Sequence, residues 1–136
     1  MNILGIGTDL VETARIASAL DRLGDSFLKR CFTESEIAYC QRHANASLPF
    51  AARWAAKEAI AKAFGTGIGP EMSLVELEIV KLPSGQPTVV LHGNALKHAQ
   101  SIGVVEIKIS LTHTEHYAAA YALVLVGAKP IAGEGS

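Results

Sequence analysis

The stretch FAARWAAKEAIAKAFGTGIG, residues 50–69, decides the fold of this chain. Seven of its first fourteen residues are Ala, the strongest helix former, so the stretch predicts one long helix. At 100° per residue, one face of that helix carries mainly small side chains: Ala52, Ala56, Ala59, Ile60 and Ala63. Small side chains let another element approach closely, so we expect this helix to lie at the centre of the fold.

The other half of the same helix is charged, with Trp54 among the charges: Arg53, Lys57, Glu58 and Lys62. One interpretation is a solvated face with a single Glu58–Lys62 ion pair, worth roughly a few tenths of a kcal/mol. The other interpretation starts from the apolar remainder of the helix, because buried charges need partners. The glycine-rich exit over residues 65–69 would let a ligand approach the backbone. On this second interpretation, the region holds phosphate and a metal.

Composition limits the class of protein. The 136 residues predict one domain, and 49% hydrophobic with only 6% aromatic residues indicates apolar surface covered by other subunits. A net charge of −1 gives no basic surface for nucleic acid. Cys31 and Cys40 lack metal-ligand spacing, so we expect two buried, reduced thiols, typical of a cytosolic protein.

No part of the chain predicts a membrane segment. The first residues, MNILGIGTDLVE, lack the basic region and the cleavage site of a signal peptide. The longest apolar run, residues 117–128, is too short to span a bilayer. We therefore expect a soluble, cytoplasmic protein with no membrane partner.

Residues 2–11 predict a buried strand with Asp9 near its end. Asp9 either caps the next element or is paired or bound to a metal, because an isolated buried carboxylate is costly. Residues 13–23 predict an amphipathic helix that Gly24 ends. Arg15 and Arg22 lie beside its apolar stripe, either as solvated charges or as a docking surface for an acidic partner.

The remaining segments alternate helix and strand. A capping box over residues 33–36 starts a helix that runs to about His43, and Leu48 should be extended because it precedes Pro49. After the central helix we expect a hairpin, a short helix and a second strand pair, over residues 74–82 with 88–91, 93–102, and 104–111 with 117–126. The chain thus predicts an α+β domain over residues 1–127, with helices packed on a mainly antiparallel sheet. Residues 128–136 are rich in Gly and Pro and predict a disordered tail.

Two histidines, His113 and His116, lie three residues apart in the last turn. A zinc site there lacks a third soft ligand. His113 at a strand end either donates to an anion or satisfies the loop backbone.

Three blocks of sequence resemble the signatures of the holo-[acyl-carrier-protein] synthase family, the short bacterial-type branch of the 4′-phosphopantetheinyl transferases. They are GIGTDLVE at 5–12, RCFTESE at 30–36 and RWAAKEAIAKAFGTG at 53–67. GQP at 85–87 and SLTH at 110–113 match later blocks. The likeness spans nearly the whole chain in order and spacing, and its central block is highly specific.

The resemblance implies a fold, an activity and a site. The family transfers 4′-phosphopantetheine from coenzyme A to a serine of acyl carrier protein and releases adenosine 3′,5′-bisphosphate. Asp9 and Glu58 match its Mg²⁺ ligands, and carboxylate oxygens suit that ion. Lys62 matches a catalytic position and would contact the diphosphate together with Gly65, Thr66 and Gly67. The 3′-phosphate would be held by Arg53 and His113, with Thr112 in the same block.

The resemblance also implies partners. The family forms a homotrimer with sites between subunits, serves fatty acid and lipid biosynthesis, and docks the carrier on its first helix, where Arg15 and Arg22 match. Asp21 and Asp25 dilute that basic patch, so they bear on carrier affinity rather than on the reaction. Trp54 stands where Phe is commoner, and Thr112 where many members have Ser.

Two functions of other classes use the same residues. A metal-dependent nucleotide pyrophosphatase would need the same acids and cations, with water as acceptor. A non-enzymatic oligomeric binding protein would place these charges along a subunit seam. The base that activates the acceptor serine stays open, either a metal-bound water or one of the acids through water.

Overall fold

Five helices and two antiparallel sheets make up residues 1–127, the part of the chain that the computed structural model describes. The elements in order are β1 (Asn2–Glu12), α1 (Thr13–Leu23), α2 (Asp25–Cys31), α3 (Glu34–Gln41), α4 (Ser47–Phe64), a 3-10 turn (Leu74–Glu76), β2 (Leu77–Lys81), β3 (Pro87–Leu91), α5 (Gly93–Ser101), β4 (Val104–His113) and β5 (Tyr117–Val126). The predicted α+β class is confirmed. The tail predicted over residues 128–136 lies outside the described residues.

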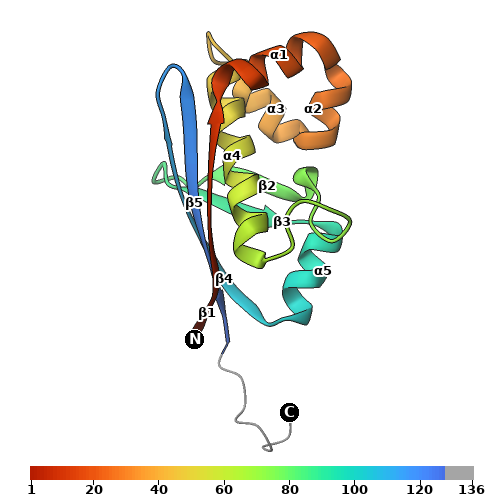
Figure 1. The fold of residues 1–136 in the computed structure, drawn as a ribbon, viewed down its shortest axis with the longest axis vertical. Helices are drawn as coiled ribbons and strands as arrows, with labels where there is room; N and C mark the ends of the chain where they lie inside the picture. Colours follow the sequence, from red (N-terminus) through yellow and green to blue (C-terminus); the bar gives the residue numbers. More distant parts are fainter. Residues whose placement is uncertain (128–136) are drawn as a thin grey trace, which may run out of the picture.

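The long sheet has the strand order β1–β5–β4, and α4 runs along one of its faces (Figure 1). Helices α1 to α3 gather at one end of the long strands, and α5 lies toward the other end. The β2–β3 hairpin forms the second sheet. As predicted, both cysteines are buried and free of disulfides, and within residues 1–127 no helix is long and apolar enough to cross a membrane.

Contact between β1 and α4 is unusually close because both contribute small residues. A Cβ atom added at Gly5 would lie 2.1 Å from the carbonyl oxygen of Ala63, and one at Gly7 would lie 1.9 Å from that of Ala59. No side chain fits at either glycine. The expectation of a central helix with a small-residue face is therefore confirmed, and β1 is the element that approaches it.

The outward face of β1 contradicts the prediction of a buried strand. Gly7 and Val11 are buried against the core, but Ile3, Ile6 and Leu10 are 65%, 68% and 65% exposed. Tyr121 on the neighbouring strand β5 is also exposed. The prediction of a strand was correct, but the prediction that both of its faces are buried was wrong. The sequence shows that the strand is apolar and does not show which face the rest of the chain covers.

Three local predictions differ from the structure. Leu48 is helical rather than extended, because α4 already starts at Ser47 and Pro49 lies in its first turn, where a missing N–H costs nothing. The predicted strand start at Leu74 was wrong by three residues, since a capping box between Ser73 and Glu76 closes a 3-10 turn there. The short helix α2 was not anticipated.

Candidate active site

Asp9 and Lys62 meet where β1 crosses α4. The Lys62 ammonium donates to Asp9 Oδ1 at 3.1 Å and to the Thr8 carbonyl oxygen at 3.0 Å. The Asp9 side chain is 13% exposed and that of Lys62 is 51% exposed. Lys62 therefore pairs with Asp9 and not with Glu58, the partner that helical spacing suggested. The contact follows from the close approach that Gly7 allows.

Glu58 lies beside this pair on α4. Burial raises the pKa of its carboxyl group, and the charge of Asp9 raises it further, while Lys62 and Arg15 oppose the shift. Glu58 lies one helical turn before Lys62, which contacts Asp9, so the two carboxylates are near each other despite 48 intervening positions. Two carboxylates in one half-buried site repel each other, so the site favours a bound cation.

One oxygen of the pair is unsatisfied. Asp9 Oδ2 is buried and has no hydrogen-bond partner among residues 1–127. Such an atom costs stability unless a ligand or an ion contacts it. Since those residues contain no cluster of three or more His, Cys, Asp or Glu side chains, a metal here would have two carboxylate ligands. Mg²⁺ fits this donor set, because it keeps several waters and binds through one or two carboxylates plus substrate phosphates.

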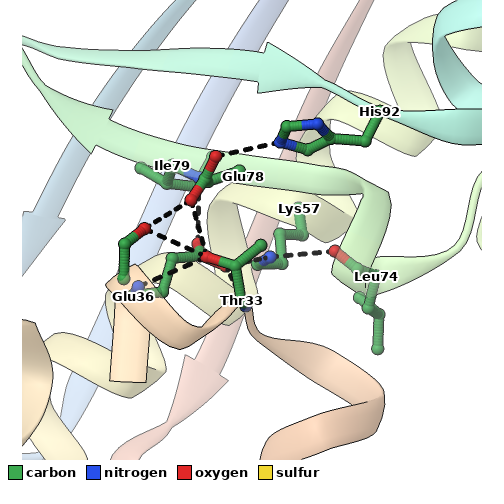
Figure 2. Close-up of polar contacts among 8 residues, drawn as sticks. Thr33, Glu36, Lys57, Leu74, Glu78, Ile79 and His92 are labelled. Carbon is green, nitrogen blue, oxygen red and sulfur yellow. Dashed lines mark hydrogen bonds and ion pairs between the residues drawn. The ribbon is translucent and has the colours of Figure 1, made fainter. Parts of the chain in front are cut away.

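Lys57 and Arg53 are buried, so the solvated-face interpretation is wrong for both. The Lys57 ammonium is fully buried and donates to Glu36 Oε1 and to the Leu74 carbonyl oxygen, each at 2.8 Å. Glu36 also accepts from the backbone N–H groups of Thr33 and Ile79 (Figure 2). This network joins α3, α4 and the start of β2, and its charges are paired.

Arg53 lies in a different setting. Its side chain lines a cavity of about 570 Å³ together with His113, and the residue is 6% exposed. Arg53 Nε is buried and has no hydrogen-bond partner in residues 1–127. A buried guanidinium nitrogen without a partner, in a cavity that a histidine also lines, favours an anionic ligand. The two residues that the resemblance assigned to the 3′-phosphate therefore share one cavity.

Four further residues were predicted to contact coenzyme A, and none of them lines the cavity that contains Arg53. The N–H groups of Gly65 and Gly67 donate to the carbonyl oxygens of Lys62 and Ala61, where they close the C-terminus of α4. The Thr66 hydroxyl donates to the Gly67 carbonyl oxygen. Side chains alternate along β4, so Thr112 faces away from the side on which His113 lines the cavity. The assignment of these four residues to coenzyme binding stays a prediction.

Arg15 and Arg22 share a surface on α1. Both line a shallow cavity of about 360 Å³ with Trp54, and the Arg15 guanidinium lies 5.8 Å from the centre of the Trp54 ring. Arg22 Nε donates to Ser18 Oγ at 3.2 Å. Because Arg15 also influences the pKa of Glu58, this basic surface borders the carboxylate site.

Two residues of the anion cavity were missed by sequence reasoning. Tyr39 comes from α3 and Lys81 from the end of β2, and both line the cavity with Arg53. Neither belongs to a motif or to the charged face of α4. Only the packing of α3 and the hairpin against α4 brings them together.

Comparison with known proteins gives a consistent assignment. The family model described as the 4′-phosphopantetheinyl transferase superfamily matches residues 5–122. The chain belongs to this superfamily, and it is therefore an enzyme of the phosphopantetheinyl transferase class.

Its relatives belong to one family within this superfamily. A holo-[acyl-carrier-protein] synthase of Koribacter versatilis is 49% identical over 118 residues, 87% of this chain and 94% of that protein. The crystal structure of the Neisseria meningitidis holo-[acyl-carrier-protein] synthase superposes with a TM-score of 0.85 at 30% identity, over 91% of this chain and 99% of that one. The Helicobacter pylori enzyme of the same name, in complex with coenzyme A, gives a TM-score of 0.78 at 32% identity, over 88% and 99%.

Proposed function

We propose that this chain transfers 4′-phosphopantetheine from coenzyme A to a serine of apo acyl carrier protein, with one Mg²⁺ ion held by Asp9 and Glu58. Membership of the superfamily supports the reaction, and the names of the relatives supply donor and acceptor. One observation carries the proposal. The buried side-chain atoms that lack hydrogen bonds within residues 1–127 are Asp9 Oδ2 and Arg53 Nε, an acceptor for a cation and a donor for an anion.

The carboxylate half of the site handles the reacting diphosphate. The serine oxygen bonds to the phosphorus that carries pantetheine, the bond from that phosphorus to the bridging oxygen breaks, and adenosine 3′,5′-bisphosphate leaves as the serine proton is released. When bound, Mg²⁺ would neutralise the diphosphate and stabilise charge on the leaving oxygen. Lys62, half-exposed beside Asp9, adds a positive charge at the same place.

The anion half of the site holds the 3′-phosphate of coenzyme A. Arg53 provides the buried guanidinium, and His113 lines the same cavity. Because Arg53 and Glu58 are five residues apart, they point about 140° apart around α4. One coenzyme would therefore use the Asp9–Glu58 pair of one copy and the Arg53 cavity of another.

A homotrimer with sites between subunits accounts for this separation. The exposed residues Ile3, Ile6, Leu10 and Tyr121 cover the outward face of the β1–β5–β4 sheet. Burying such a face against other copies is favourable, since apolar surface is removed from water. The same assembly would then complete the active site.

The acidic carrier protein binds at α1, next to the carboxylate site. Arg15 and Arg22 supply the charge and Trp54 an apolar contact, all on one cavity. This modification serves fatty acid biosynthesis in the cytoplasm.

A single assay tests the proposal against its rivals. The protein is incubated with coenzyme A, Mg²⁺ and apo acyl carrier protein, and the carrier is weighed by mass spectrometry. A mass gain of one phosphopantetheine, lost with EDTA and restored by Mg²⁺, supports the transfer. Hydrolysis of coenzyme A without carrier would instead indicate a pyrophosphatase, and no turnover a binding protein.

Carrier docking has its own test. The double variant Arg15→Glu, Arg22→Glu should raise the KM for the carrier by about tenfold or more and leave the KM for coenzyme A unchanged. Lys97→Glu, a charge reversal exposed on α5, serves as the control. An unchanged carrier KM in the double variant would rule out this surface.

A further inference from the structure

The cavity around Arg53 contains more basic side chains than the two that the proposed function uses. It lies where α3, the start of α4, the end of β2 and the end of β4 meet, and His43 and Lys81 line it as well. No carboxylate is among its lining residues. The cavity therefore gathers positive charge that the chain itself does not neutralise.

The Tyr39 ring lies close to two cations that line the cavity and to Arg42, which does not line it. The Arg53 guanidinium carbon is 4.1 Å from the centre of the Tyr39 ring, and the Lys81 ammonium and Arg42 guanidinium carbon are each 5.4 Å from it. The face of an aromatic ring is electron-rich and attracts cations at such distances. In the absence of a carboxylate, the ring is the group that holds these mutually repelling charges near one another.

The ionisation of Tyr39 agrees with this arrangement. A hydrogen bond with Lys81 is the largest cause that lowers the pKa of the Tyr39 phenol, burial opposes it, and the charges of Lys81 and Arg53 lower the pKa further. The tyrosine is half-buried and lines the cavity.

We infer that Tyr39 is a positioning residue, which holds Arg53 and Lys81 in the cavity so that the enzyme distinguishes a phosphate monoester from a hydroxyl group on its donor. The inference rests on the proposed function, in which this cavity takes the 3′-phosphate of coenzyme A. It adds two residues, Tyr39 and Lys81, and a consequence, selection against dephospho-coenzyme A. A dianionic phosphate gains from both cations, whereas the 3′-hydroxyl of dephospho-coenzyme A gains little.

The specificity ratio of kcat/KM for coenzyme A to kcat/KM for dephospho-coenzyme A tests this. We expect Tyr39→Leu to lower the ratio by about tenfold, because the ring no longer holds the cations. Tyr39→Phe keeps the ring and loses only the hydroxyl group, so it should lower the ratio less than Tyr39→Leu. Lys81→Gln, at an exposed position, should lower the ratio, whereas Lys97→Gln on α5 should not.

If Tyr39 had a purely structural role, its loss would lower kcat/KM by the same factor for both donors. If Tyr39→Leu lowers kcat/KM equally for the two donors, or leaves the ratio unchanged, the inference is wrong. Lys81→Gln decides the same question should Tyr39→Leu fold poorly, since Lys81 is an exposed residue at a strand end. An unchanged ratio in Lys81→Gln would remove Lys81 from the cavity's function.

Nucleotide binding separates this inference from the transfer reaction itself. Adenosine 3′,5′-bisphosphate and adenosine 5′-monophosphate are titrated by calorimetry into wild type and the Tyr39 variants. We expect a weaker affinity for the bisphosphate alone in Tyr39→Leu. If the wild type shows no transfer but Tyr39→Leu still loses affinity for the bisphosphate alone, the proposed function fails and the phosphate-binding role of Tyr39 stands. Equal losses of affinity for both nucleotides would overturn that role.

Discussion

Two groups of charged side chains on or beside α4 differ in how completely the protein satisfies them. Lys57 is fully buried and paired with Glu36, which in turn accepts backbone hydrogen bonds (Figure 2). Arg53 and Asp9, in contrast, each keep one buried atom without a partner in residues 1–127. Charges of the first kind join elements of the fold, and charges of the second kind are available to ligands.

This difference could not be read from residue type. Lys57 and Glu58 are adjacent in the sequence, but 100° of helical rotation turns Lys57 toward α3 and Glu58 toward Asp9. Lys57 finds a carboxylate of opposite charge, while Glu58 finds one of the same charge. The completeness of pairing, rather than the presence of charge, separates a structural position from a functional one.

The largest effect is expected at the carboxylate site. Glu58→Gln and Asp9→Asn should each reduce transfer by about 10³-fold, because the ligands of the cation are lost. Stability should stay unchanged or rise slightly in Glu58→Gln, which removes the repulsion with Asp9, whereas Asp9→Asn also loses the ion pair with Lys62. Transfer is measured by carrier mass, and thermal unfolding gives the stability.

Mg²⁺ itself supplies a second measurement on the same variants. It should raise the Tm of the wild type and have a smaller effect on Glu58→Gln, because ligand binding stabilises only the form that binds. Full activity of either variant, or an equal Mg²⁺ effect on the Tm of wild type and Glu58→Gln, would contradict the metal assignment.

The next prediction tests whether one active site combines the carboxylate half-site of one copy with the Arg53 half-site of another. Glu58→Gln and Arg53→Gln proteins should each transfer poorly alone. Mixed, dissociated and reassembled, they should recover activity, because about a quarter of the interfaces in a random closed oligomer combine two intact half-sites. Reassembly of Glu58→Gln with Asp9→Asn, which damage the same half-site, is the control and should recover nothing. Absence of recovery in the first mixture would mean that each chain forms a complete site.

Breaking the satisfied network should affect folding instead of catalysis. Lys57→Ala leaves Glu36 buried and unpaired, which should cost about 3–5 kcal/mol of unfolding free energy. The double variant Glu36→Leu, Lys57→Met should cost clearly less, since it removes both charges. Lys97→Ala on the surface is the control. Urea unfolding at one protein concentration measures all four proteins, and a loss below about 1 kcal/mol in Lys57→Ala would show that the pair contributes little.

Much of the fold followed from short-range patterns. The limits of α1, the capping box at Thr33 and the small-residue face of α4 were predicted from spacing alone, because each depends on residues within a few turns. Predictions failed where distant contacts decide. The outward residues of β1 stayed exposed because nothing in residues 1–127 covers them. Leu48 failed for a local reason, since Pro49 fits the first turn of α4.

The candidate site was predictable only in part, for the same reason. The family resemblance, and not any local pattern, predicted that Asp9 and Glu58 bind the same ion. Tyr39 and Lys81 were missed because they reach the Arg53 cavity from α3 and β2. Whether a charge is paired depends on its three-dimensional neighbours, so the contrast between Lys57 and Arg53 required the structure.

The smallest effect concerns Glu78, the second carboxylate of the network in Figure 2. Its side chain accepts from Thr33 Oγ1 at 2.7 Å, from Ser35 Oγ, and pairs with His92 Nε2 at 2.9 Å. Burial raises the pKa of Glu78, but these three contacts outweigh it and lower the pKa to about 2. At pH 7, Glu78→Gln should therefore lower the unfolding free energy by about 1–3 kcal/mol.

The pH dependence distinguishes charge from shape. A carboxyl pKa below its unfolded value of about 4.3 stabilises the fold above that pH, and the contribution is lost as the pH falls toward about 2. The difference between wild type and Glu78→Gln should thus shrink as the pH falls below about 4.3. Glu71→Gln, at an exposed carboxylate, is the control. A difference that persists unchanged at pH 3 would mean that the charge of Glu78 adds nothing to the unfolding free energy, because protonation removes the charge of the carboxylate and leaves its size unchanged.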